Sequence, residues 1–110
     1  MLIAGTIVAS NLATNVLIRA LGPTLTRYGV PNALADPTLA LYDANGALVT
    51  SNDNWPDTQQ TAIQATNLAP PDNRESAILA TLPPGNHTAI VRGKNGAMGV
   101  ALVEVYRLNN

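Results

Sequence analysis

The chain has 110 residues, of which 46% are hydrophobic and only 12% charged, and its net charge at pH 7 is −1. This length fits one domain, which we place at residues 1–110. The charge balance excludes the basic surface that binds a nucleic-acid backbone, and no apolar run reaches the about 20 residues of a membrane-spanning helix. We therefore expect neither a nucleic-acid partner nor membrane insertion. The absence of cysteine excludes disulfides, thiolate metal sites and a cysteine nucleophile.

The first two apolar segments predict strands. Residues 2–9, LIAGTIVA, lack the preceding cationic residues of a secretory signal, so any such signal is expected upstream of this sequence. Residues 15–21, NVLIRAL, are apolar on both faces, which is typical of a central strand, and Gly22-Pro23 ends it. The connection that follows, 23–37, is expected to cross between sheets, with at most a helical turn at 32–35.

The stretch from Asp36 to Ser51 predicts a β-hairpin. Its first half, PTLALY, alternates with the period of two of a strand that is buried on one face. Asn45-Gly46 lies between the two apolar runs, and this pair is a strong signal for a hairpin turn.

The second half of the chain predicts one short surface helix and three more strands. The helix is expected at 57–67, where Ile63 is almost the sole large apolar residue. Strands are expected at 76–82, 87–92 and 99–108, with a turn at 83–85 and a second hairpin turn at 94–96. These spacings predict an all-β protein, an antiparallel sandwich of about seven or eight strands.

The order of these motifs resembles the bacterial extracellular pre-peptidase C-terminal domain, which is found near the C-termini of large exported proteins. The matching stretches are DPTLALYDANGALVTSNDNW, Arg74-Glu75-Ser76, LPPGNHTAIVRG and GVALVEVY. The resemblance implies a jelly-roll-like sandwich, an extracellular or cell-surface location and, as in some members of that family, binding of calcium or of a fibrous substrate.

Acidic and amide side chains cluster after the predicted hairpin strands and suggest a possible calcium site. Calcium takes about six to eight oxygen ligands, and the candidates are Asp43, Asn45, Asp53 and Asp57, with Asp72 and Glu75 as a second possibility. The competing interpretation is that Asp and Asn bond to their own backbone in turns. No cofactor is expected to be required for folding.

Trp55 and His87 are two further candidate functional residues. Trp55 is either an exposed stacking platform for a ligand or a hydrophobic plug over the core, and the plug is favoured. His87 is the single histidine, and no serine has the context of a nucleophile. We therefore expect no catalytic residue. Arg92 or Arg107 is expected to pair with Glu104 across strands.

These observations favour a non-enzymatic extracellular module with a structural, adhesive or self-assembly role. The weakly charged surface lacks the usual deterrent to association, and the two terminal apolar strands could pair with another copy to give a filament by strand addition. The alternative is an accessory module that binds carbohydrate or fibrous protein for a secreted enzyme.

Overall fold

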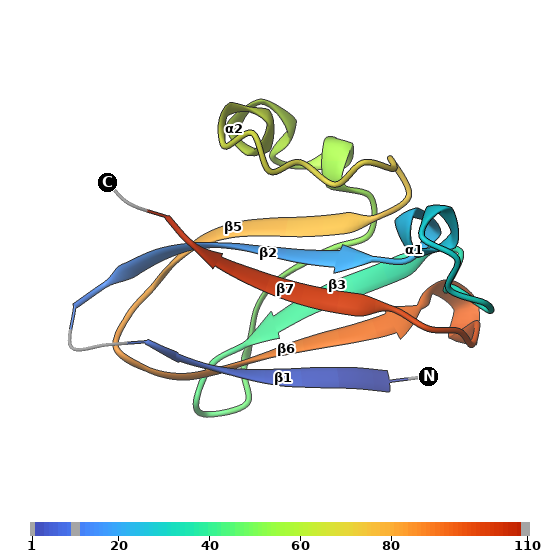
Figure 1. Cartoon of the computed structure of the whole chain (residues 1–110). Coiled ribbons are helices and arrows are strands. Elements are labelled where there is room, and N and C mark those ends of the chain that lie inside the picture. Colours follow the sequence, from blue (N-terminus) through green and yellow to red (C-terminus); the bar gives the residue numbers. More distant parts are fainter. Residues whose placement is uncertain (1, 10–11, 109–110) are drawn as a thin grey trace.

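The computed structural model describes residues 2–9 and 12–108. Within them the chain forms seven strands: β1 (Leu2–Ala9), β2 (Thr14–Leu21), β3 (Pro37–Tyr42), β4 (Leu48–Asn52), β5 (Ser76–Leu82), β6 (Gly85–Gly93) and β7 (Leu102–Arg107) (Figure 1). The helical segments are α1 (Pro23–Arg27), α2 (Gln60–Ala65) and two short 3-10 turns, η1 (Trp55–Asp57) and η2 (Lys94–Gly96).

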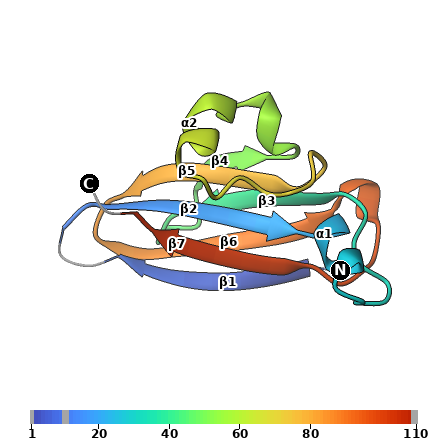
Figure 2. The same cartoon turned by 45° about the horizontal axis from the view of Figure 1, so that its top comes forward.

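The strands form two antiparallel sheets that lie one over the other (Figure 2). One sheet has the order β1-β6-β3-β4 and the other the order β5-β2-β7. In the described residues, β3 and β4 are the one pair of consecutive strands that share a sheet, and every other connection crosses between the sheets. The predicted all-β class, the antiparallel sheets and the crossing of the 23–37 connection are confirmed.

Successive side chains of β2 point to opposite faces of its sheet, and both faces are covered by other parts of the chain. Val16, Ile18 and Ala20 lie in the core between the sheets, together with β3 and β6 side chains such as Leu41 and Val91. Burial of each large aliphatic side chain there contributes about 1.5–3 kcal/mol to the stability of the folded state. Leu17 points to the opposite face, where it joins a second apolar cluster. The prediction that β2 is a central strand buried on both faces is therefore confirmed.

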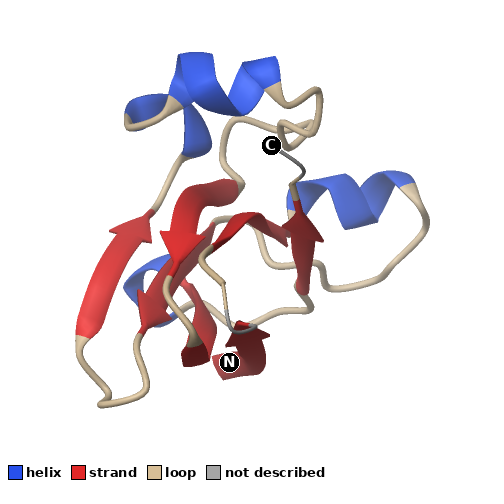
Figure 3. Cartoon of the chain, turned by 90° about the vertical axis from the view of Figure 1, so that its left-hand side faces the viewer, coloured by secondary structure: helices blue, strands red, loops and turns tan. Residues whose placement is uncertain are grey.

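The second cluster lies beneath α2 and η1, which cover the outer face of the three-stranded sheet (Figures 2 and 3). Its buried members are Leu17, Trp55, Ile63 and Ala77. The predicted helix at 57–67 is present but is restricted to Gln60–Ala65. Ile63 is fully buried, so a single large apolar side chain anchors this short helix.

The β3–β4 hairpin forms as predicted, and its turn depends on Asp43 and Gly46. Gly46 has a φ of +79°, a conformation that glycine adopts without the steric cost that a Cβ would bring. The Asp43 carboxylate accepts hydrogen bonds from the backbone N–H groups of Asn45 and Ala47, each at 2.9 Å. Asp43 thus closes the turn with its own side chain.

Two local predictions are wrong. The helical turn of the 23–37 connection lies at Pro23–Arg27, where Pro at the first helical position favours a helix start, and not at 32–35. Residues 94–96 do not form a hairpin turn, because β6 and β7 belong to different sheets. These residues form a corner that leads from one sheet to the other, which is a long-range arrangement that turn residues alone do not specify.

A close backbone approach holds α1 against the connection that follows it. A Cβ built on Gly22 would lie 2.1 Å from the carbonyl oxygen of Leu34, so a side chain cannot be accommodated there. The Leu34 N–H in turn donates to the Val100 carbonyl at 2.7 Å. This contact places α1, the connection and the approach to β7 at one end of the sandwich (Figure 1).

Among the described residues, no helix has the length and apolar character needed to cross a membrane.

Candidate functional site

The four residues proposed as calcium ligands lie in two separate places. Asp43 and Asn45 belong to the hairpin turn before β4, whereas Asp53 and Asp57 follow the far end of that strand. Five residues of extended chain span roughly 13 Å from first to last Cα, so these four side chains do not surround one ion. No group of three acidic or histidine side chains with the spacing of a metal site occurs in residues 2–9 and 12–108.

Asp53 lies beside Asp36 and Lys94, two residues that no local sequence pattern connects with it. The Lys94 ammonium forms an ion pair with Oδ2 of Asp53, and the Lys94 N–H donates to the Asp36 carbonyl at 2.9 Å. Burial raises the pKa of Asp36, and the adjacent Asp53 charge raises it further. The cluster thus ties the chain before β3 to the loop after β4 and to the corner after β6.

Trp55 is a core residue. Its side chain is only 6% exposed and packs with Leu17, Ile63 and Ala77. The indole Nε1 has no hydrogen-bond partner among the described residues, so the ring acts through apolar contact. The plug interpretation agrees with this burial, whereas a stacking platform needs an exposed ring face.

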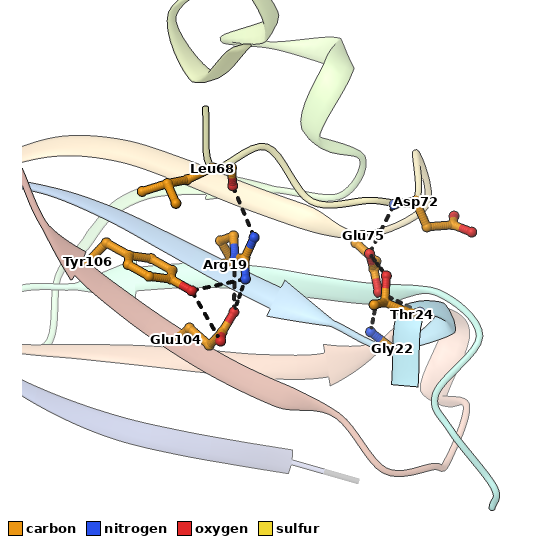
Figure 4. A network of polar contacts seen from close by, with 8 residues as sticks. All are labelled: Arg19, Gly22, Thr24, Leu68, Asp72, Glu75, Glu104 and Tyr106. Atoms are coloured by element: carbon orange, nitrogen blue, oxygen red, sulfur yellow. Dashed lines mark hydrogen bonds and ion pairs between the residues drawn. The ribbon is translucent and has the colours of Figure 1, made fainter. Parts of the chain in front are cut away.

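Glu75 is fully buried and links three segments through hydrogen bonds (Figure 4). Its Oε2 accepts from the backbone N–H groups of Gly22 at 2.8 Å and Thr24 at 2.9 Å. Its Oε1 accepts from the Thr24 hydroxyl at 2.6 Å and the Asp72 N–H at 3.1 Å. Because Gly22 offers no side-chain cap to α1, the Glu75 carboxylate satisfies helix donors from a distant part of the chain.

Arg19 and Glu104 form a second polar network on the outer face of the three-stranded sheet (Figure 4). The guanidinium donates to the Glu104 carboxylate, with an Nε–Oε1 distance of 2.9 Å, and to the Leu68 carbonyl at 3.1 Å. The guanidinium also lies over the Tyr106 ring, 5.1 Å from its centroid. The prediction that Glu104 pairs with Arg92 or Arg107 is wrong, because the ladder places β2 beside β7.

His87 lies in β6 and is 3% exposed, with Nδ1 3.3 Å from the carbonyl oxygen of Gly85. Ser76, at the start of β5, donates its hydroxyl to the carbonyl of Pro37 at 3.0 Å. Both polar side chains are therefore engaged with nearby backbone.

Exposed apolar side chains concentrate on and just before β7. Of the eight large apolar residues that are exposed in the described part of the chain, four lie there: Met98, Val100, Leu102 and Val105. Within residues 2–9 and 12–108, β7 pairs along one edge only, with β2. β4, at the edge of the other sheet, carries Leu48 and Val49. β7 and the residues just before it thus carry half of the exposed large apolar side chains whose burial the structure describes.

Comparison with known proteins identifies no relative. No protein-family model, no curated protein and no solved structure matches this chain. The strand order described above defines an all-β protein with two antiparallel sheets.

Proposed function

We propose that this chain is a non-enzymatic structural module that self-associates by adding a strand of a second copy to the edge of β7. The observation that carries this proposal is that β7 pairs with one strand only within the described residues and has four exposed apolar residues on and before it. An edge strand presents unpaired backbone N–H and C=O groups, which another strand can satisfy.

The order of the strands supports a jelly-roll-like fold with a vacant position beside β7. Eight-stranded jelly rolls consist of two four-stranded sheets, and nearly every connection passes from one sheet to the other. The described residues have the same alternation, with four strands in one sheet and three in the other. In such a fold an added strand beside β7 would complete the smaller sheet.

Pairing of β7 with β7 of a second copy would give hydrogen-bond partners to the free backbone groups of both edge strands at once. A two-fold axis through Val105 would bring the two Val105 side chains together. In this register Glu104 lies opposite Tyr106 of the second copy, so two carboxylates do not oppose each other. The result would be a six-stranded sheet that spans two molecules.

β1 is a less suitable donor for this added strand. It pairs with β6 from Leu2↔Arg92 to Ala9↔Gly85, so donating it to another copy would first break an intramolecular ladder. We therefore place the association at β7, and a symmetric pair predicts a dimer. A filament would require a second free edge, for which β4 is available.

An extracellular or cell-surface location is part of the proposal. It rests on the resemblance of the motif order to the pre-peptidase C-terminal domain. No cofactor is proposed for folding. The buried Glu75 carboxylate, for example, is held by the backbone N–H and the hydroxyl of Thr24.

Light scattering over a range of protein concentrations tests the proposal, using the substitution Val105→Lys. The wild-type mass is expected to rise from the 11.5 kDa of one chain towards twice that value. Val105→Lys should remain monomeric, because two lysines would meet at the two-fold axis and charged side chains block edge pairing.

Val49→Lys is the matched control, since Val49 is an exposed valine on the edge strand of the other sheet. It makes the same change of charge and should leave the concentration dependence unaltered. A wild-type protein that stays monomeric at every concentration, or dimerisation lost in Val49→Lys and kept in Val105→Lys, would overturn the β7 interface.

A further inference from the structure

A second feature lies at the end of the sandwich where Glu75 holds α1 against the turn before β5. A pocket of about 350 Å³ opens there, which is within the size range of small-molecule sites. Its charged lining consists of Arg27 of α1 and of Asp72 and Arg74 from the turn before β5. Pro23, Ala33 and Ala35 supply apolar lining.

The two arginines, Arg27 and Arg74, differ in how many of their N–H donors already bind an acceptor. Arg74 donates through Nε and Nη2 to the two oxygens of Asp72, each at 3.1 Å, and this pairing lowers the pKa of Asp72. Arg27 has one ion pair within the described residues, at 4.0 Å to Oδ2 of Asp72. Apart from this long contact, the Arg27 guanidinium has no hydrogen-bond or ion-pair partner in residues 2–9 and 12–108.

The charges that line the pocket sum to +1, because two guanidinium groups flank a single carboxylate. A planar guanidinium matches a carboxylate through two parallel hydrogen bonds. We propose that this pocket binds a small organic carboxylate, which Arg27 holds through its guanidinium while the apolar part of the ligand rests on Pro23, Ala33 and Ala35.

Glu75 fixes the two charged segments that line the pocket, α1 and the turn before β5, relative to each other. One oxygen of its carboxylate holds the N–H groups of Gly22 and Thr24 at the start of α1, and the other holds the N–H of Asp72. The helix that carries Arg27 and the turn that carries Arg74 are therefore fixed to the same buried group. Because these segments are already fixed, less conformational entropy is lost when a ligand binds.

The experiment is an NMR titration of the protein with benzoate, which joins a carboxylate to an apolar ring, and with benzamide as its neutral analogue. Benzoate should shift the Arg27 and Arg74 signals saturably at millimolar concentrations, and benzamide should bind at least about tenfold more weakly, since the charged hydrogen bonds are lost. Inorganic phosphate, an anion without an apolar part, should also bind more weakly than benzoate.

Arg27→Gln is the test variant, and Arg92→Gln, at an exposed position on β6, is its matched control. Arg27→Gln should weaken benzoate binding by about tenfold. The melting temperature should be unchanged, because Arg27 makes only one long ion pair with the residues that the structure describes. Arg92→Gln should leave the affinity unaltered. Absence of saturation, equal binding of benzamide, tighter binding of phosphate or full affinity in Arg27→Gln would each overturn the proposal.

Discussion

Arg19 of β2 lies directly opposite Glu104 of β7 in the antiparallel ladder, and the two side chains are joined by hydrogen bonds although 85 positions separate them in the chain. Both are largely shielded from solvent, with side-chain exposures of 13% and 27%. This pair, with Tyr106 hydrogen-bonded to both residues, connects the central strand to the strand for which we propose an association role.

Replacing Arg19 by Met is expected to lower the free energy of unfolding by roughly 2–3 kcal/mol, because Glu104 and the Leu68 carbonyl lose a charged donor in a partly buried site. Glu104→Gln should cost less, since the amide still accepts from Arg19. A double-mutant cycle in urea that combines Arg19→Met with Glu104→Ala, which removes the acceptor, should give a coupling of about 1–2 kcal/mol. Additive effects of the two substitutions would contradict the direct interaction.

Glu75→Gln is expected to destabilise the protein by roughly 2–4 kcal/mol. The four groups that contact the carboxylate are donors in the structure, and a glutamine amide nitrogen cannot accept from the N–H groups it would face. Chemical denaturation measures the effect. The control is Glu104→Gln, the same substitution at a partly exposed carboxylate, which should cost distinctly less.

Asp36→Asn is expected to stabilise the protein at pH 7, by about 1 kcal/mol if the amide donates to the neighbouring Asp53 carboxylate. Burial and the Asp53 charge raise the pKa of Asp36, while Lys94 and Arg74 partly oppose them. The folded state therefore holds this proton more tightly than the unfolded state.

The protonated Asp36 carboxyl therefore contributes its full stability below the ordinary pKa of 3.8. This contribution is lost as the pH rises through the raised pKa of Asp36 in the folded state. Unfolding measured in urea between pH 3.5 and 7 should show that the advantage of Asp36→Asn over wild type grows with pH. Asp57→Asn, which removes an exposed carboxylate, should not reproduce this trend. An advantage that shrinks as the pH rises would contradict the assignment.

Trp55→Ala is expected to lower the free energy of unfolding by about 3–5 kcal/mol, because it leaves a cavity between α2 and β2. Trp55→Phe should cost much less, since the indole N–H gives up no hydrogen bond in the described structure. As Trp55 is the one tryptophan in the chain, its fluorescence reports the same site. Tyr28→Ala, at an 80% exposed aromatic, should change stability by no more than about 0.5 kcal/mol.

Several elements of the fold could be predicted from local pattern alone. Alternation of apolar residues located β2 and β3 to within a residue or two, and Asn45-Gly46 located the hairpin turn. These features depend on side chains within a few positions of one another, so a single stretch of sequence contains the information. The corner at 94–96 was misassigned because the same turn residues serve a hairpin and a crossing between sheets.

The candidate sites depended on contacts that no local pattern contains. Asp53 was recognised as a polar candidate, but its neighbours are Asp36 and Lys94 rather than Asp43. Arg27 and Arg74 face one pocket because the distant Glu75 joins α1 to the turn before β5. Arg19, an isolated charge in an apolar strand, was the one sequence signal for the network with Glu104.

The sequence by itself therefore determined the all-β class, the approximate extent of most strands and the aliphatic character of the core, because alternation and turn chemistry act over short distances. The tertiary structure decided which strands share a sheet, which charges are buried and which strands lie at the sheet edges. Those properties arise when residues far apart in the chain, such as Arg19 and Glu104 or Gly22 and Glu75, come within hydrogen-bonding distance. Burial then strengthens each contact by removing competing water.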